Sequence, residues 1–139
     1  MENYDPQAIV IDFGGILIRG TAKGSFVKVT QEADTFTDVV GNDGSVTRVR
    51  NRDERGNIVI TIMAESVTND QLSAVHLADK EFGLSTKGVL IKDLKGTTLV
   101  TAKDAWIMKF AEIEYGDDGG SREWTIRCAK LVQYVGGSL

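Results

Sequence analysis

The sequence predicts a mainly β protein: a small β-barrel or β-sandwich of about eight strands with one flanking α-helix. Three observations support this fold class. Most of the chain alternates apolar and polar residues with the period of two that strands have, whereas only the stretch 66–83 has the apolar spacing of a helix. Proline, which interrupts strands, occurs once, at Pro6. At 139 residues, the whole chain 1–139 is expected to form a single domain.

The expected helix begins at Asn69, whose side chain can accept a hydrogen bond from the free amides of the first turn. It ends at Gly83, because glycine readily adopts the left-handed conformation that closes a helix. One face, predicted to cover an opening of the sheet, carries Leu72, Val75, Ala78 and Phe82. Leu77 lies on the opposite side and is a candidate contact with another subunit.

The first half of the chain is expected to contain four strands. A strand over 8–19 bends at Gly14–Gly15 and forms a hairpin with a strand over 25–31. Strands over 46–52 and 57–65 follow, and both faces of the latter are partly apolar. Neither of those two faces is therefore expected to lie simply against water.

The second half of the chain is expected to form two hairpins. The first joins 87–93 to 98–103. The second joins 105–115 to 122–135, and its strands are longer than the usual five or six residues. Both faces of these long strands again carry apolar residues, which suits strands that pack against the subunit core on one side and a neighbour on the other.

Residues 32–45 break this strand pattern and are expected to form a long acidic loop. They contain no basic residue, their apolar residues have no stable period, and they end in the turn signal Asn42-Asp43-Gly44. A loop of this length is usually functional or disordered, and its apolar residues predict that it folds onto its own body or onto a neighbour. The residues expected to make that contact are Asp34, Phe36, Asp38, Val39, Val40 and Asp43.

Three arginines, Arg48, Arg50 and Arg52, share one face of the strand expected over 46–52. One interpretation is a small nucleic-acid-binding β-barrel whose arginines track phosphates. No aromatic residue accompanies them on that face, and the net charge of −4 argues against a general nucleic-acid binder. The preferred interpretation is that the arginines pair with the carboxylates of 32–45, within the subunit or across a contact between subunits.

The residue types that catalysis and metal binding need are scarce. His76 is the only histidine and Cys128 the only cysteine, too few for a structural zinc site or an internal disulfide. We expect His76 to be partly buried or at an interface, and Cys128 to be a buried structural thiol. The chain is not expected to be an enzyme or to use a cofactor or metal, and no apolar run approaches the length of a membrane span.

Several segments, taken in order, resemble the tail tube proteins of contractile-tail bacteriophages, which are related to the tubes of R-type bacteriocins and type VI secretion. The resemblance covers the chain from Ile9 to Gly137. The segments that carry it are Asp34-Thr-Phe-Thr-Asp-Val-Val-Gly-Asn-Asp-Gly-Ser-Val-Thr-Arg48, Asn57-Ile-Val-Ile-Thr-Ile-Met-Ala-Glu-Ser-Val-Thr-Asn-Asp-Gln-Leu-Ser73, Ala105-Trp-Ile107, Arg122-Glu-Trp-Thr-Ile126 and Val135-Gly-Gly137.

The resemblance implies a structural subunit whose copies form hexameric rings, which stack into the inner tube of a contractile tail and give DNA a passage. It implies as partners the sheath, baseplate, tail-terminator and tape measure proteins, with genomic DNA held in the lumen without sequence-specific binding and no membrane. The protein would be assembled in the host cytoplasm and located in the virion tail. Another ring-forming part, a tail terminator or baseplate hub element, is an alternative. The candidates for facing the lumen are Thr61, Glu65, Glu112 and Glu114.

Overall fold

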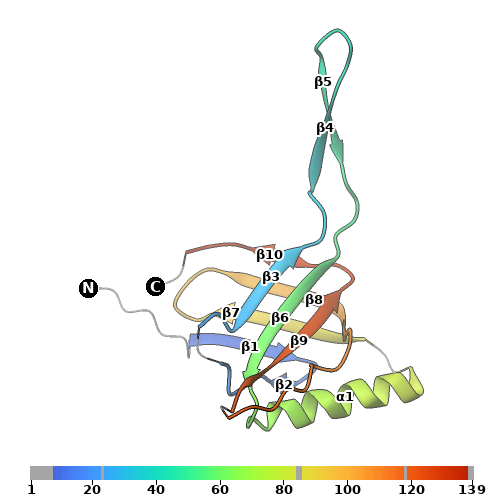
Figure 1. Cartoon of the computed structure of the whole chain (residues 1–139). Helices are drawn as coiled ribbons and strands as arrows, with labels where there is room; N and C mark the ends of the chain where they lie inside the picture. The colour runs from blue at the N-terminus through green and yellow to red at the C-terminus, as the bar shows by residue number, and fades with distance from the viewer. Residues whose placement is uncertain (1–7, 23, 84–85, 118, 138–139) are drawn as a thin grey trace.

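The computed structural model describes residues 8–22, 24–83, 86–117 and 119–137, and within them the chain forms ten strands and one helix (Figure 1). The strands are β1 (Ile9–Phe13), β2 (Ile16–Leu17), β3 (Val27–Gln31), β4 (Phe36–Val40), β5 (Val46–Arg50), β6 (Gly56–Met63), β7 (Lys87–Asp93), β8 (Leu99–Ile107), β9 (Ser121–Cys128) and β10 (Val132–Tyr134), and the helix is α1 (Thr68–Phe82). The predicted fold class, mainly β with one flanking helix, is confirmed.

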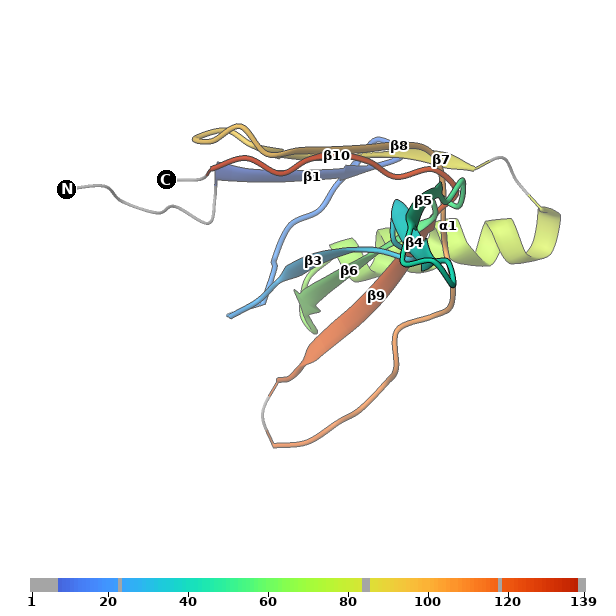
Figure 2. The same cartoon turned by 90° about the horizontal axis from the view of Figure 1, so that it is seen from above.

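Eight of the strands form one antiparallel sheet in the order β2-β1-β7-β8-β9-β6-β3, and β10 pairs with β8 beside this path. The sheet turns a corner where the end of β8 pairs with the end of β9, as in the pair Ile107 and Ile126. It thereby folds into two layers, which Figure 2 shows from above. We call them the β7 layer (β2, β1, β7, β8 and β10) and the β6 layer (β3, β6 and β9). The two layers make an open β-sandwich, with α1 along one side.

The core lies between the two layers and follows from strand alternation. On β6, Ile58, Ile60 and Ile62 all point inward and are 0% exposed, as the sequence predicts for one face of this strand. The inward side chains of the other strands that complete the core include Ile11, Phe13, Val89, Ile91, Val100, Trp124 and Ile126. Burying an aliphatic side chain of this size stabilises the fold by about 1.5–3 kcal/mol.

Truncation of a central core residue is expected to be costly. Ile60→Ala removes a fully buried side chain from the middle of β6, so the free energy of unfolding should fall by about 2–5 kcal/mol. Urea unfolding of the unassembled subunit measures this change. The control Val46→Ala removes a side chain that is 65% exposed and should change the free energy of unfolding by less than about 0.5 kcal/mol.

The start of α1 differs from the prediction. Asn69 is not the N-cap: the helix begins after Val67, which makes no capping side-chain hydrogen bond. The Asn69 amide instead donates to the Met63 carbonyl at 3.0 Å, and its Oδ1 accepts the indole N–H of Trp124 at 2.9 Å. The buried indole N–H requires an acceptor, and this tertiary contact outweighs a local cap. The predicted closure at Gly83 is confirmed, with φ 59° and ψ 50° and its amide bound to the Asp79 carbonyl at 2.7 Å.

Only the first half of α1 packs against the sheet. Leu72 is fully buried and Val75 packs against the core, but Phe82 is 78% exposed, so its predicted place on the covering face is wrong. The reason is length: the last turns of α1 extend past the edge of the sandwich (Figure 1). Leu77 is 51% exposed on the outer side.

Two predicted features of the N-terminal strands are also wrong. Gly14–Gly15 does not bend one long strand but makes the tight turn between β1 and β2, where both glycines have positive φ. The expected hairpin of 8–19 with 25–31 does not form, because β3 pairs with β6 instead. The chain runs from β3 through β4 and β5 directly into β6, which makes β6 the nearest antiparallel partner of β3.

The predicted C-terminal hairpin of 105–115 with 122–135 is wrong as well. β8 is one strand over Leu99–Ile107, and the return is split into β9 and β10. β8 and β9 lie in different layers, so they pair only at the corner, and β9 pairs along its whole length with β6. Residues 108–117, which we call the crossover, therefore leave the sheet and expose Ile113 and Tyr115.

Candidate self-assembly surfaces

Residues 36–50 form a two-stranded arm that projects from the body, instead of the predicted acidic loop (Figure 1). Among the residues that the structure describes, β4 and β5 pair only with each other, and every residue of both is exposed. Asp43 closes the tip, because its carboxylate accepts the Ser45 amide at 3.0 Å and the Ser45 hydroxyl at 2.7 Å. These two hydrogen bonds lower the pKa of Asp43. A strand without a buried face lacks an apolar period, which explains why the pattern of 32–45 indicated a loop.

The two faces of the arm differ in chemistry. Cross-strand partners point to the same side, so the register separates a charged face from a neutral one. The charged face consists of Phe36, Asp38, Val40, Val46, Arg48 and Arg50. The neutral face consists of Thr37, Val39, Thr47 and Val49. On the charged face, the Arg48 guanidinium lies 4.3 Å from the centre of the Phe36 ring, a cation–π contact.

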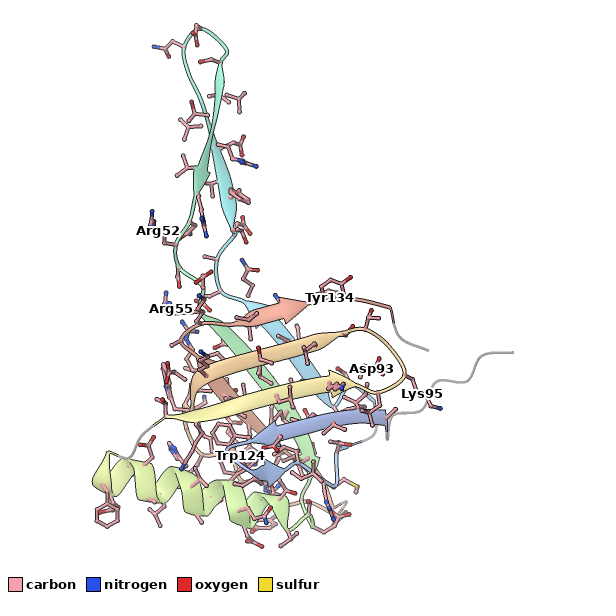
Figure 3. All side chains as sticks on the ribbon, turned by 180° about the vertical axis from the view of Figure 1, so that it is seen from behind. Arg52, Arg55, Asp93, Lys95, Trp124 and Tyr134 are labelled. Carbon is pink, nitrogen blue, oxygen red and sulfur yellow. The ribbon has the colours of Figure 1, made fainter. Side chains whose placement is uncertain are left out.

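The predicted arginine stripe is only partly present. Arg48 lies opposite Asp38 and Arg50 opposite Phe36, but β5 ends at Arg50 and Arg52 belongs to the base of the arm (Figure 3). Among the residues that the structure describes, no ion pair within 4.0 Å joins these arginines to a carboxylate. The expected pairing within the subunit is therefore replaced by cross-strand proximity and the aromatic contact, which leaves the charges available at the surface.

Polar contacts fix the base of the arm to the β6 layer. The Asn51 amide donates to the Thr35 carbonyl at 2.8 Å, which brings the two ends of the arm together. Arg127, on β9, donates to Glu32 at 3.0 Å and to Asn57 at 2.9 Å. The direction of the arm is thus tied to β9 as well as to β3 and β6.

A second ion pair at this base gives a pH prediction. Arg55 donates to both carboxylate oxygens of Asp53 at 2.9 Å, and these hydrogen bonds lower the pKa of Asp53 from 3.8 to about 2. Because the folded pKa is depressed, the contact is fully present above pH 3.8 and is lost as the pH falls through about 2. Carboxyl-carbon NMR should show Asp53 titrating near pH 2, and Arg55→Ala should move its titration back toward 3.8.

The outward face of the β6 layer is largely polar. Its side chains alternate with the buried isoleucines, and those of β6 include Asn57, Val59 and Thr61. Their outward neighbours on β3 and β9 are Lys28, Thr30, Glu123, Thr125 and Arg127. Of the lumen candidates, Thr61 lies on this face opposite Glu123, and Glu112 and Glu114 line a hollow with Glu123. Glu65 is exposed just after β6.

The β6 layer has open edges on both sides. β3 ends the strand order, and β9 is paired with β8 only over its last three residues. A cleft of about 430 Å³ also separates the two layers beside β3, where the sandwich does not close. The side chains that line it are mostly apolar and include Ile9, Phe26, Val27, Val29, Ile91 and Val135. Unpaired backbone groups along such edges favour pairing with another chain.

Cys128 and His76, the two residues considered for catalysis, both pack against other side chains of the fold. Cys128 is 0% exposed, and burial raises the pKa of its thiol to about 11, which suppresses the nucleophilic thiolate. His76 is half-buried and packs edge-on against Phe110 of the crossover, with ring centres 4.6 Å apart. In the described residues, no three His, Cys, Asp or Glu side chains gather as a metal site would require. No helix in the same residues is both long and apolar enough to cross a membrane.

Sequence reasoning missed the neutral face of the arm. The sequence pattern places two of its residues, Thr37 and Val39, in a loop and the other two, Thr47 and Val49, in a separate strand, whereas the register puts all four on one face. A signal was present: two β-branched runs flank the turn at Asn42-Asp43-Gly44, and that arrangement indicates a hairpin.

Chains in solved structures of contractile injection systems have the same fold. The sheath–tube complex of an extracellular contractile injection system has a chain that superposes with a TM-score of 0.60 at 10% identity, covering 96% of this chain and 92% of that one. The tube-terminating cap of the anti-feeding prophage matches with a TM-score of 0.60 at 8% identity, covering 97% and 93%. At these identities the likeness defines the fold: that of tail-tube-like subunits.

The particular family follows from the sequence match. The family model of the bacteriophage PhiTE tail tube protein matches residues 8–136, so this chain belongs to that family of phage tail tube proteins. The structural protein ORF10 of Pseudomonas phage KPP10 is 30% identical over 124 residues, which are 87% of this chain and 71% of that protein. The resemblance to tail tube proteins is confirmed, and the chain is a structural component of a phage tail.

Proposed function

We propose that this protein forms hexameric rings, and that the rings stack into the inner tube of a contractile phage tail through which DNA passes. The observation that carries the proposal is the pair of open edges on the β6 layer, together with an arm whose two strands are exposed throughout and, among the described residues, pair only with each other. Membership of the tail tube family supports assembly into a tube. Pairing of the open edges between copies provides a way to close each ring.

Within a ring, the β3 edge of one copy pairs with the β9 side of the next, where the crossover also lies. A closed ring leaves no unpaired strand edge, which removes the tendency toward uncontrolled aggregation. The polar outward face of the β6 layer then becomes the channel lining. Thr61, Glu65, Glu112 and Glu114 face the lumen in this arrangement.

A net negative charge suits the passage of DNA. The chain has a net charge of −4. The lumen candidates add three carboxylates and a hydroxyl, beside Glu123 and the cations Lys28, Lys109 and Arg127. Negative charge repels phosphates, so DNA slides without binding to the wall. DNA and the tape measure protein occupy the channel in turn, without sequence-specific contacts.

Between rings, the arm contacts the neighbouring ring. Its exposed residues Phe36, Asp38, Val39, Val40, Arg48 and Arg50, with Asp34, Asp43 and Arg52 at its ends, form that contact. Leu77 on α1 adds a contact between subunits. The sheath, baseplate and tail-terminator proteins are further partners, and assembly takes place in the host cytoplasm before the tail becomes part of the virion.

Electron microscopy of the purified protein tests the proposal. At high concentration we expect rings with six-fold symmetry and tubes with an open channel of a few nanometres, on the order of the width of a DNA duplex with its hydration. A protein that remains monomeric at the same concentration would contradict the proposal.

A tail terminator is the second candidate, because the solved structures of this fold include a tube-terminating cap with the same TM-score as the matching chain of the sheath–tube complex. A terminator closes a tube and does not extend it. Single rings that never polymerise, at any concentration, would favour this candidate over the tube subunit.

A further inference from the structure

The crossover has the alternation of a strand, although 109–117 form none. Ala111, in step with Ile113 and Tyr115, packs against the core of its own subunit. The residues between these three line a hollow beside the outward side chains of β9, and they are Glu112 and Glu114. The crossover therefore has an apolar inner side and an acidic outer side.

The two large side chains of the inner side are open to solvent. Ile113 is 74% exposed and Tyr115 is 86% exposed. The Arg122 guanidinium lies 5.5 Å from the centre of the Tyr115 ring, a cation–π contact that keeps this ring beside β9. An exposed apolar pair next to an open sheet edge favours contact with a second molecule.

The cleft beside β3 is an apolar surface that such side chains can fill. It has a volume of about 430 Å³, and Val27 and Val29 of β3 line it while being only partly buried. The crossover of the same subunit lies at the other edge of the β6 layer, because β6 separates β9 from β3. A second copy placed edge to edge, in contrast, brings its crossover to this cleft.

The charges on the two edges are complementary, which identifies the occupant as another copy of the chain. Lys28 is exposed on the outward face of β3 and has no carboxylate within 4.0 Å among the described residues. The hollow at the opposite edge is lined by one cation, Lys109, and by the carboxylates of Glu112, Glu114 and Glu123. When the apolar sides of the crossover and β3 meet, alternation places Lys28 on the same side as these carboxylates.

Strand direction favours the crossover, rather than β9, as the neighbour of β3 in the next copy. β3 and β9 run in the same direction, since both pair antiparallel with β6. The crossover starts where Ile107 pairs with Ile126 near the end of β9 and runs back to the beginning of β9, so its direction is opposite. Rotation about a ring axis preserves these directions. The crossover is therefore antiparallel to β3 of the next copy, and antiparallel pairing is the more stable kind.

We propose that the crossover of one copy docks on the β3 edge of the next copy in the ring. Its inner side, with Ile113 and Tyr115, fills the cleft of that copy. Its outer carboxylates, Glu112 and Glu114, bind Lys28. The docking rests on the proposed ring and identifies the segment that closes it. Each copy offers its crossover on one side and its cleft on the other, and such a head-to-tail contact generates a closed ring.

Charge reversal tests the ionic part of the contact, with ring formation by the purified protein followed by analytical ultracentrifugation. The variants are Lys28→Glu and the double variant Glu112→Lys/Glu114→Lys, and circular dichroism checks their folding. Each variant alone joins like charges at every contact, so the protein concentration needed for rings should rise at least about tenfold. A 1:1 mixture joins unlike charges wherever the two variants alternate around the ring, so it should form rings near the wild-type concentration.

Tyr115→Asp tests the apolar part of the contact and should also raise that concentration at least about tenfold. The matched control is Tyr134→Asp, the same substitution at a side chain that is 65% exposed on β10 (Figure 3). Tyr134 lies between Gln133 and Val135, which line the cleft, so its side chain points away from the cleft. This control should form rings as the wild type does.

Rings from either Lys28→Glu or Tyr115→Asp at the wild-type concentration would overturn the docking of the crossover and leave the proposed ring intact. Folded charge variants that fail alone and also fail in the mixture would overturn it too, because the two charged groups would then not meet. Wild-type protein that forms no rings at all contradicts the proposed function, and the docking of the crossover with it.

Discussion

Removal of the arm is expected to abolish tube formation completely while the subunit stays folded. The variant replaces residues 36–50 with Gly-Gly, which links Thr35 to Asn51. These two residues are already joined by a backbone hydrogen bond of 2.8 Å, so a short link can close the gap. Every residue of β4 and β5 is exposed, and the core therefore loses nothing. Sedimentation and electron microscopy should find no tubes. The free energy of unfolding measured in urea should change by less than about 0.5 kcal/mol.

Point variants separate the two faces of the arm in the same experiment. Val39→Asp places a charge on the neutral face, and Asp38→Asn removes one from the charged face. If the neutral face is the one that docks, Val39→Asp should prevent stacking at equal protein concentration, whereas Asp38→Asn should retain tubes. Tubes with normal spacing from the armless protein would show that the contact between rings lies elsewhere.

Blocking the open edge of β3 is expected to prevent ring closure. The Thr61 amide binds the Phe26 carbonyl at 2.9 Å, so residues 26, 28 and 30 bond inward to β6, and the Val29 amide points to the open edge. Val29→Pro therefore removes an edge donor without breaking a hydrogen bond to β6. Analytical ultracentrifugation should find a monomer that forms neither rings nor tubes at concentrations at which the wild type assembles.

The control Val29→Ala also removes the valine side chain but keeps the amide. It should assemble as the wild type does, with a lower free energy of unfolding because Val29 packs partly against the core. If Val29→Pro assembles as well as Val29→Ala, the β3 edge is not used between subunits.

The parts of the fold that the sequence predicted are those with a buried face. Ile58, Ile60 and Ile62 alternate strictly, so β6 and its inward side could be identified from the pattern. The predictions that Cys128 is buried and that the helix ends at Gly83 are also confirmed. Each depends on a local rule that the core reinforces.

The parts that failed are those in which the partner is distant or absent. The arm has no buried face and thus no apolar period, so the pattern of 32–45 predicts a loop. The long C-terminal strands have a good pattern, but the corner between layers divides them after Ile107 and after Cys128. Asn69 accepts a hydrogen bond from the indole of Trp124, 55 positions away. A prediction of helix caps from local sequence does not take such a distant contact into account.

The sequence alone determined the mainly β class, the single helix, the inward face of β6 and membership of the tail tube family, because alternation and order of motifs are properties of the chain itself. Only the tertiary structure decided which strands are neighbours, where the sheet turns its corner, and which edges and outward faces remain uncovered. Those depend on contacts between residues far apart in the chain, and a periodic pattern specifies that a strand has an inner side without specifying what lies opposite it.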